Sequence, residues 1–361
     1  MFVTDQNKDR CLMNPVSASH LSERLDAVPR VRFGAFPTPL QELPRLSDRL
    51  GGPRIFMKRD DLTGLGYGGN KVRKLEFAMA DLVRDGVEVV VSGAAAQSNF
   101  CRQVAAAAGR LGMAAELMLM GPADAAFQGN LLLDDVFGAD VNLVQAPGGW
   151  TELHASIASR VDTLRESGVN AAALTGFEPV GSVGYVAGML ELSHQCQEQD
   201  LVPDYLYVCS STGTQAGLEV GARALGVPCR IVGVSATARL EWYPSISARL
   251  AEVANWVAQR LSLEQHFGAE DIENTTEYVG SAYAHATPEA REAIWMLAET
   301  EGLLVDPVYT GKALAGLIDH IRSGRIGAHE SVVFVHTGGT PALFAYGDDV
   351  RRHRSQPSQQ S

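Results

Sequence analysis

A lysine placed directly after a pair of glycines is the feature of this sequence best suited to covalent chemistry. Apolar residues recur at three- and four-residue spacing after Lys71 and predict an amphipathic helix that Gly86 closes. With Asn70 as the N-cap, Lys71 lies in the first turn, where the helix dipole is positive, and Arg73 and Lys74 add positive charge. Such surroundings lower the pKa of a lysine and make it a nucleophile toward carbonyl groups, as in Schiff-base chemistry with pyridoxal phosphate (PLP). A solvated lysine at a helix start is the alternative interpretation.

The same glycines are similar to the beginning of a phosphate-binding P-loop, but the remainder of that motif is missing. A P-loop needs Gly-Lys-Ser/Thr after its Gly-x4 segment. Here Gly64 and Gly69 are followed by Asn70, Lys71 and Val72, so no hydroxyl is placed to bind magnesium. We therefore reject a nucleoside triphosphatase.

A second constellation follows the predicted helix. Val87–Val91 reads as a buried strand, Gly93–Gln97 as a turn of small residues, and Ser98 or Asn99 as the start of a helix. A strand, a tight turn and a helix N-terminus make an anion site, so the backbone amides and the Ser98 hydroxyl can hold a substrate carboxylate. Asn99 can donate to the phenolic oxygen of a pyridoxal ring. Plain N-capping is the alternative interpretation.

Three further stretches have the same strand–turn–helix character. The hydroxyl-rich turn Ser210–Gly217 follows a predicted strand and opens a helix, which suits a phosphate, although a purely structural turn fits equally well. Gly338 and Gly339 follow another predicted strand, and Pro341 stands near the first turn of the next helix. Tyr309 precedes a further helix, where a packed aromatic is the alternative to a functional residue.

Taken together, these stretches resemble the PLP-dependent fold type II group that contains D-cysteine desulfhydrase, 1-aminocyclopropane-1-carboxylate (ACC) deaminase and L-cysteate sulfo-lyase. The resemblance spans most of the chain, and its most specific string is Gly69-Asn70-Lys71-x-Arg73-Lys74-Leu75-Glu76. It implies an α/β fold of the tryptophan synthase β type, with parallel twisted sheets and helices on both faces. The implied smaller domain, residues 75–185, carries the substrate carboxylate site. The larger PLP domain is residues 1–74 plus 186–361, with 1–30 as a peripheral extension.

The resemblance also implies a role for each matching residue. Lys71 forms the Schiff base and moves the proton at the substrate α-carbon, and Thr340 or Thr310 contacts the ring nitrogen. The implied cofactor-binding residues are Lys71, Lys74, Asn99, Ser210, Ser211, Thr212, Gly213, Thr214, Thr310 and Thr340. The implied catalytic residues are Lys71, Ser98, Tyr283 and Tyr309, and the implied substrate-binding residues are Gln97, Ser98 and Asn99. No metal is expected.

Position 310 discriminates between the activities of this group. In ACC deaminases the corresponding stretch looks like Tyr-Glu-Gly-Lys. This chain has Tyr309-Thr310-Gly311-Lys312, which is similar to the D-cysteine desulfhydrase branch. A carboxylate beside the pyridine nitrogen keeps the ring protonated and a strong electron sink, because an opposite charge favours the charged form. A hydroxyl leaves a weaker sink, which is sufficient when a good leaving group departs from the β-carbon. We therefore expect α,β-elimination from D-cysteine or a similar amino acid to pyruvate, ammonia and sulfide, with ACC deamination and then L-cysteate desulfonation as alternatives.

Two segments depart from the pattern of this group. The phosphate turn is about one residue shorter and has fewer glycines. Ala282 and Ala284 flank Tyr283 where glycines are usual, and alanine loses the positive-φ freedom of glycine. The loop around Tyr283 and the native substrate can differ accordingly.

Composition restricts the other classes of function. A formal net charge of −12 argues against binding to nucleic acid or anionic membranes, and no long uncharged apolar stretch predicts a membrane span. The first ten residues lack the apolar core of a signal peptide. The cysteines show no paired metal-ligand spacing and suit a reducing cytoplasm; they are Cys11, Cys101, Cys196, Cys209 and Cys229. The expected partners are a small amino-acid substrate and a second copy of the chain in a homodimer.

Predicted strands alternate with helical stretches along the chain, which favours parallel sheets. Their carboxyl ends are the expected place for a ligand. The predicted strands are Arg54–Lys58, Val87–Val91, Ala115–Met120, Val141–Val144, Tyr205–Cys209, Arg230–Val234 and Val332–His336.

Overall fold

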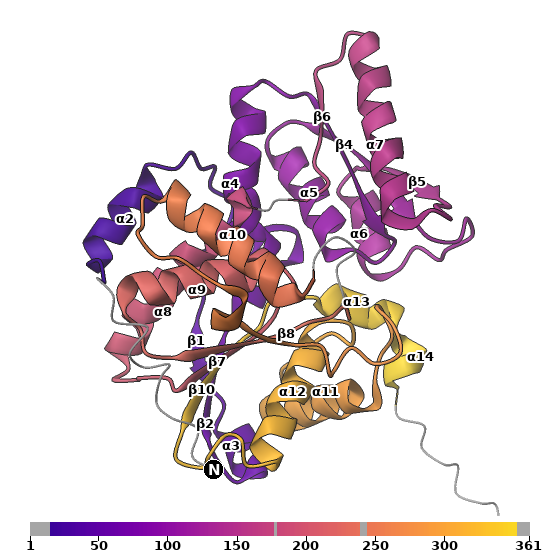
Figure 1. Ribbon diagram of the computed structural model, residues 1–361. Coiled ribbons are helices and arrows are strands. Elements are labelled where there is room, and N and C mark those ends of the chain that lie inside the picture. Colours follow the sequence, from indigo (N-terminus) through magenta and orange to yellow (C-terminus); the bar gives the residue numbers. More distant parts are fainter. Residues whose placement is uncertain (1–14, 177–178, 239–243, 352–361) are drawn as a thin grey trace, which may run out of the picture.

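The computed structural model describes residues 15–176, 179–238 and 244–351, which form two β-sheets with helices on both faces of each (Figure 1). The amino-terminal segment compared with a signal peptide, Cys11 and the tail after Arg351 lie outside the described residues. Within them, no helix has the length and apolar character needed to cross a bilayer.

The larger sheet has six strands in the order β1-β2-β10-β7-β8-β9. All neighbours in it are parallel except β1, which pairs antiparallel with β2 at the edge. Its strands are β1 Leu40–Glu42, β2 Arg54–Lys58, β7 Tyr205–Cys209, β8 Arg230–Val234, β9 Glu273–Thr275 and β10 Ser331–Val335. The register places the carboxyl ends of β2, β10, β7 and β8 along one edge, so the turns that follow them are neighbours.

The smaller sheet has four parallel strands in the order β5-β4-β3-β6. They are β3 Val89–Ala95, β4 Ala114–Met120, β5 Asp140–Val144 and β6 Ala171–Ala173. The expected domain limits at residues 75 and 185 fall inside helices that pack against elements of both halves of the chain, α4 and α8.

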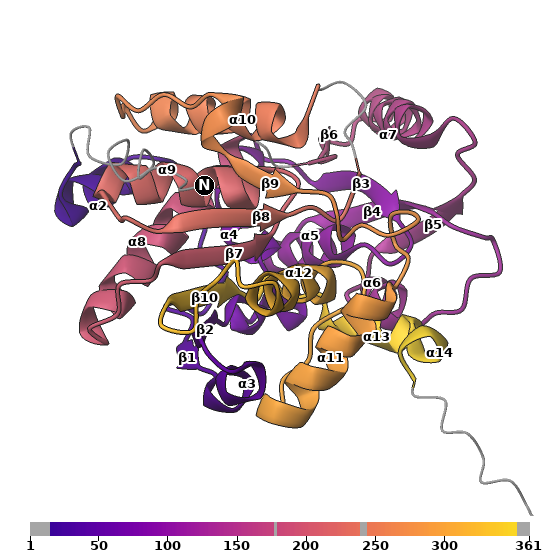
Figure 2. The ribbon, with the colours of Figure 1, turned by 60° about the horizontal axis from the view of Figure 1, so that its bottom comes forward.

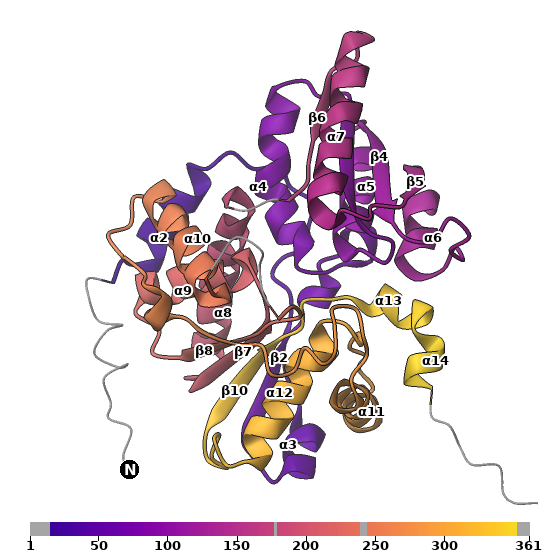
Figure 3. The same ribbon diagram turned by 45° about the vertical axis from the view of Figure 1, so that its right-hand side comes forward.

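Helices cover both faces of each sheet, as expected. On the larger sheet, α3, α11 and α12 lie on one side and α8, α9 and α10 on the other (Figures 2 and 3). On the smaller sheet, α7 lies on the opposite face from α4 and α5. The helices are α2 Ala18–Asp26, α3 Pro44–Leu50, α4 Lys71–Arg84, α5 Asn99–Arg110, α6 Gly129–Val136, α7 Gly149–Glu166, α8 Val183–Glu198, α9 Gly213–Leu225, α10 Ile246–Arg260, α11 Pro288–Glu301, α12 Thr310–Arg322, α13 Thr340–Ala345 and α14 Gly347–Val350.

One expected strand has different bounds in the structure, and three short strands were not expected. The strand expected over Val87–Val91 runs over Val89–Ala95, so Gly93 belongs to the strand and not to the turn. A Cβ at Gly93 would lie 2.4 Å from a backbone oxygen of β4 and 2.9 Å from Ile157 Cδ1. Gly93 is therefore a packing glycine that lets α7 approach β3. The strands β1, β6 and β9 were not predicted, because three polar or alanine-rich residues carry little strand signal.

The amino-terminal extension is less peripheral than expected. Ser17 caps α2, and Leu21, Leu25 and Val28 are buried in a core cluster shared with α8, α9 and α10. Their burial ties the described part of this segment to the helices on one face of the larger sheet.

Candidate active site

Three of the motifs singled out in the sequence meet at the first turn of α4. The Asn70 N–H donates to Thr337 O at 2.9 Å, and Asn70 Nδ2 donates to Thr214 Oγ1 at 3.1 Å. The glycine turn of Lys71, the hydroxyl-rich turn and the segment after β10 are therefore in contact. Asn70 occupies the N-cap position, but its side chain does not cap α4 because it is directed to Thr214.

Two glycines allow this close approach. Gly69 and Gly338 have φ values of 124° and 94°, which a residue with a Cβ rarely adopts. A Cβ on Gly338 would lie 2.7 Å from Gly69 Cα. The turn before Lys71 and the turn after β10 therefore pack backbone against backbone.

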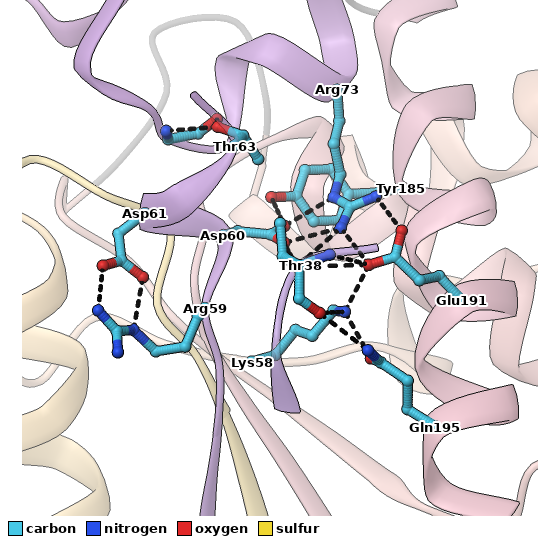
Figure 4. A network of polar contacts seen from close by, with 11 residues as sticks. Thr38, Lys58, Arg59, Asp60, Asp61, Thr63, Arg73, Tyr185, Glu191 and Gln195 are labelled. Carbon is cyan, nitrogen blue, oxygen red and sulfur yellow. Dashed lines mark hydrogen bonds and ion pairs between the residues drawn. The ribbon is translucent and has the colours of Figure 1, made fainter. Parts of the chain in front are cut away.

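A buried ionic network fixes α4 two residues after Lys71 (Figure 4). Arg73 donates through Nε and Nη2 to both carboxylate oxygens of Asp60 at 2.8 Å, and through Nη1 and Nη2 to Glu191 at 3.0 and 2.8 Å. Lys58 Nζ donates to Glu191 Oε1 at 2.5 Å. Arg73 holds the pKa of the Asp60 carboxyl below its usual value although burial opposes the effect.

This network corrects one step of the sequence argument. Arg73 was counted as a positive charge that depresses the pKa of Lys71, but two carboxylates neutralise it. Its contribution is positional, because the segment after β2 holds the Lys71 turn on both sides. The Gly69 N–H donates to Asp60 O and Thr63 Oγ1, while the Asp60 carboxylate holds Arg73.

Two tyrosines from distant segments lie next to Lys71. Lys71 Nζ is 5.6 Å from the centroid of the Tyr309 ring, on its face. The hydroxyls of Tyr309 and Tyr283 are hydrogen-bonded, and their rings are edge to face with centroids 6.0 Å apart. Burial raises the pKa of Tyr309 well above its ordinary value, so this phenol is a proton-bearing donor at neutral pH. Tyr283 is 38 % exposed and forms the open side of the pair.

The loop that carries Tyr283 keeps a backbone typical of glycine at one of its alanines. Ala284 has φ +67°. The left-handed region costs a residue with a Cβ about 1–2 kcal/mol, so the alanine retains the loop shape at an energetic cost.

A buried carboxylate that the sequence reasoning gave no role organises the turn of Tyr309. Asp306 is 0 % exposed and accepts the N–H groups of Val308, Tyr309 and Thr310. The Thr310 hydroxyl donates to Asp306 Oδ1 at 2.6 Å and accepts from the Asp306 N–H at 2.9 Å. The hydroxyl expected near a ring nitrogen is thus already engaged with Asp306.

The hydroxyl-rich turn ends at the N-terminus of α9, as expected for an anion site. Ser210 Oγ accepts from the Gln215 N–H at 3.0 Å and so shapes its own turn. Ser211 Oγ is 2.6 Å from the hydroxyl of Ser235, which follows β8 and was missed in the sequence. Thr212 is the N-cap residue, with Gly213 and Thr214 in the first turn of the helix. Ser235 could have been expected beside the hydroxyl-rich turn, because it follows the carboxyl end of β8, which pairs with β7.

The turn after β3 presents Ser98 and Asn99 at the start of α5. Ser98 Oγ accepts from two backbone N–H groups and caps the helix. Asn130 Nδ2 donates to Asn99 Oδ1 at 2.9 Å, which directs the Asn99 Nδ2 donors elsewhere. The Gln97 carboxamide donates to Gln128 O and accepts from the Asn130 N–H, so it holds the start of α6.

The remaining predicted residues occupy the rim and interior of the same region. Lys74 is buried one helical turn after Asn70, and Thr340 is half-buried at the start of α13. Gly129, at the start of α6, approaches α13 so closely that a Cβ would lie 2.9 Å from Pro341 O. Elements of both sheets therefore border the site. No cluster of three or more possible metal ligands occurs among residues 15–176, 179–238 and 244–351.

The donor set fits a pyridoxal phosphate group. A lysine stands beside the start of α9, where backbone N–H groups and hydroxyls suit a phosphate. Asn70 Oδ1 is buried without a hydrogen-bond partner, so it offers an acceptor to a polar group of a ligand. The oriented amide of Asn99 adds a donor suited to a ring oxygen.

Comparison with known proteins gives the family of this chain. The chain belongs to the family of pyridoxal-phosphate dependent enzymes, whose model matches residues 31–338. It is 39 % identical over 332 residues to a D-cysteine desulfhydrase of Klebsiella pneumoniae (strain 342), covering 90 % of this chain and 98 % of the relative. It is 36 % identical over 334 residues to a D-cysteine desulfhydrase of Salmonella typhimurium, with the same coverage. The predicted PLP dependence is confirmed.

Solved structures confirm the fold class. An ACC deaminase homologue superposes with a TM-score of 0.83 at 33 % identity, covering 92 % of this chain and 98 % of that chain. Threonine deaminase isoform 2 from Solanum lycopersicum superposes with a TM-score of 0.64 at 17 % identity, covering 93 % and 89 %. The second likeness concerns the fold alone.

Proposed function

We propose that this enzyme is a lyase that catalyses α,β-elimination from D-cysteine or a close analogue, giving pyruvate, ammonia and sulfide. The observation that carries the proposal is the site around Lys71 combined with 36–39 % identity to enzymes named D-cysteine desulfhydrase over 90 % of the chain. PLP, when bound, supplies the electron sink for negative charge at the substrate α-carbon.

The residues of the chain divide the remaining work. Lys71 links to the cofactor and moves the proton at the substrate α-carbon. The Ser98 turn orients the substrate carboxylate through the amides at the start of α5, and Asn99 donates to the cofactor ring oxygen. The Asn130–Asn99 hydrogen bond supports this assignment because it fixes the orientation of the Asn99 amide. Tyr309 and Tyr283 keep protonated hydroxyls on the substrate side.

The phosphate is assigned to the start of α9, with Lys74 as a neighbouring positive charge. Ser210, Ser211, Thr212, Gly213 and Thr214 make up this cradle. Thr310 or Thr340 is proposed to face the ring nitrogen as an uncharged group. The Thr310 hydroxyl already donates its proton to Asp306. A contact of Gln97 with the substrate carboxylate remains a prediction. In the structure, the Gln97 carboxamide contacts Gln128 and Asn130.

ACC deamination is the second candidate. The structural neighbour titled an ACC deaminase homologue, with a TM-score of 0.83, favours it. Thr310 argues against it, because opening a cyclopropane lacks a β-leaving group and requires a stronger electron sink. We further propose a cytoplasmic homodimer with a larger domain of residues 1–74 plus 186–361 and a smaller domain of residues 75–185.

Turnover of a defined substrate panel tests the proposed reaction. The panel is D-cysteine, L-cysteine, β-chloro-D-alanine, ACC and L-cysteate, with 2-oxo acid, ammonia and sulfide measured as products. We expect clear turnover of D-cysteine and β-chloro-D-alanine and negligible turnover of ACC. Efficient ACC deamination without elimination from either D-amino acid would contradict the argument from Thr310. Activity on L-cysteate alone would keep the elimination chemistry and change the substrate.

Removing one hydroxyl of the α9 start is expected to weaken PLP binding. Thr214→Val keeps the side-chain shape and deletes the hydroxyl that accepts from Asn70 and is proposed to donate to the phosphate. PLP binding should therefore weaken by roughly 1–3 kcal/mol, the usual cost of a lost charge-assisted hydrogen bond. Equilibrium dialysis measures the dissociation constant. Thr300→Val on α11, whose hydroxyl donates to Met296 O, is the matched control. Equal affinities of the two variants would assign the phosphate to another place.

A further inference from the structure

Two side chains of helix α5 hold the backbone immediately before Lys71. Arg102 Nη2 donates to Gly68 O at 2.9 Å, and Gln103 Nε2 donates to the same oxygen. Both side chains are 0 % exposed. A buried carbonyl with two side-chain donors has a fixed position, because losing either donor in the absence of water costs free energy. The turn of Lys71, at the edge of the larger sheet, is therefore held by a helix of the smaller sheet.

The same helix begins at the turn proposed for the substrate carboxylate. Ser98 caps α5, Asn99 is its first residue, and Arg102 lies one helical turn later. A displacement at the Ser98 turn moves Arg102 with it, since both belong to one hydrogen-bonded helix start. Gly68 is three residues before Lys71, so the displacement reaches the lysine turn through the side-chain hydrogen bonds of Arg102 and Gln103 to Gly68 O.

The far side of the Arg102 guanidinium lies in a buried polar cluster. Arg102 Nε and Nη1 and both carboxylate oxygens of Asp134 on α6 are buried without a hydrogen-bond partner. Burial raises the pKa of Asp134 to about 8, and the charge of Arg102 opposes this rise. Burial likewise lowers the pKa of Arg102 to about 10, and the charge of Asp134 opposes the fall. The interface between α5 and α6 therefore contains buried polar groups whose hydrogen-bonding capacity is not used by the described residues.

Burying these polar atoms without hydrogen-bond partners lowers the stability of the fold. Apolar side chains of the same size at both positions would avoid burying polar atoms that have no hydrogen-bond partner. What apolar residues cannot provide is a directed donor to Gly68 O. The Arg102 guanidinium therefore serves to fix the position of Gly68 O.

We infer that Arg102 is a positioning residue that couples the Ser98 turn to Lys71 through its hydrogen bond to Gly68 O. The inference rests on the proposed function. A substrate carboxylate at the start of α5 fixes that helix start, Arg102 fixes Gly68, and the Lys71 amine is thereby placed to take the proton from the substrate α-carbon.

Arg102→Met tests the coupling, with Arg102→Lys restoring one donor. In Arg102→Met we expect kcat to fall about 100-fold, the cost of a displacement near 1 Å, while the affinity for PLP stays at the wild-type value. The visible spectrum of the PLP-loaded variant should also change without substrate, because Lys71 is displaced relative to the cofactor. Arg102→Lys should recover part of both losses. Arg110→Met, at the exposed end of α5, is the matched control and should match wild type.

The outcomes separate coupling from a purely structural role. Wild-type kcat and spectrum in Arg102→Met would overturn the inference, as would parallel losses of PLP affinity and kcat. If Arg102→Met does not fold, Arg102→Gln and Arg102→Lys decide: lowered kcat with retained PLP affinity supports the coupling, and wild-type kcat in both overturns it. Failure of the proposed function is distinct, because wild type itself would then show no elimination activity.

Discussion

Replacing Lys71 with alanine is expected to reduce elimination activity by at least about 10³-fold, because the group that moves the α-proton is removed. The purified wild-type protein should be yellow, and borohydride should fix the cofactor irreversibly to one lysine. Peptide mapping should identify that lysine as Lys71. The Lys71→Ala variant should still bind PLP through the turn at α9, since the phosphate contacts are unchanged.

Lys74 is the internal control for the borohydride labelling, because it is the neighbouring lysine that should carry no label. It lies one turn further along α4, is buried, and is assigned to the phosphate instead of the covalent link. Borohydride label on Lys74, or wild-type turnover by Lys71→Ala, would contradict the assignment. A protein that takes up no PLP at all would contradict the whole site.

Asp60→Asn is expected to lower the free energy of unfolding by about 3–5 kcal/mol, because Lys58 and Arg73 then share the single carboxylate of Glu191 and one buried positive charge is uncompensated. Asp60 is 1 % exposed and accepts hydrogen bonds from Arg73, Thr38 and Tyr185. Urea unfolding monitored by circular dichroism measures the change. Activity should fall as well, since Arg73 lies two residues after Lys71.

Asp61→Asn is the control, with the same substitution at the next residue. Asp61 pairs with Arg59 at 2.8 Å, and both side chains are partly exposed, at 12 % and 13 %. Its loss should cost less than that of Asp60, because Asp61 has one charged partner, Arg59, at the margin of the solvent, whereas Asp60 is fully buried with three donors. Equal destabilisation by the two variants would show that the buried network has no special weight.

The sign of the pH dependence follows from the depressed pKa of Asp60 in the folded state. A carboxyl with a lower pKa in the folded protein stabilises it fully above the unfolded-state pKa, about 3.9, and loses this contribution as pH falls through the folded-state pKa. The stability advantage of wild type over Asp60→Asn should therefore be constant near neutral pH and shrink below about pH 4. An advantage that grows on acidification would contradict the ionised state of Asp60.

Local patterns carried most of the fold prediction. The buried strands of the larger sheet, such as β7 and β8, were predicted to the residue because continuous apolar runs bounded by turns mark parallel strands. The start of α4 at Lys71 was predicted from a glycine turn followed by helical periodicity. Gly93 shows the limit of this reasoning, because a small residue marks either a turn or a close contact. The partner that decides between them, Ile157, is 64 residues away.

The sequence by itself predicted the class of enzyme, which the comparisons confirm, and the turns around Lys71, which the structure brings together; the covalent role of Lys71 stays a prediction. These are properties of short segments, since turns and helix starts depend on neighbouring residues. Only the tertiary structure decided which charges and hydroxyls are already engaged. Arg73 is neutralised by Glu191, 118 residues away, the Asn99 amide is oriented by Asn130, and Asp306 engages Thr310. Charge and hydrogen bonding act through space, so their partners are set by how the two sheets pack and not by spacing along the chain.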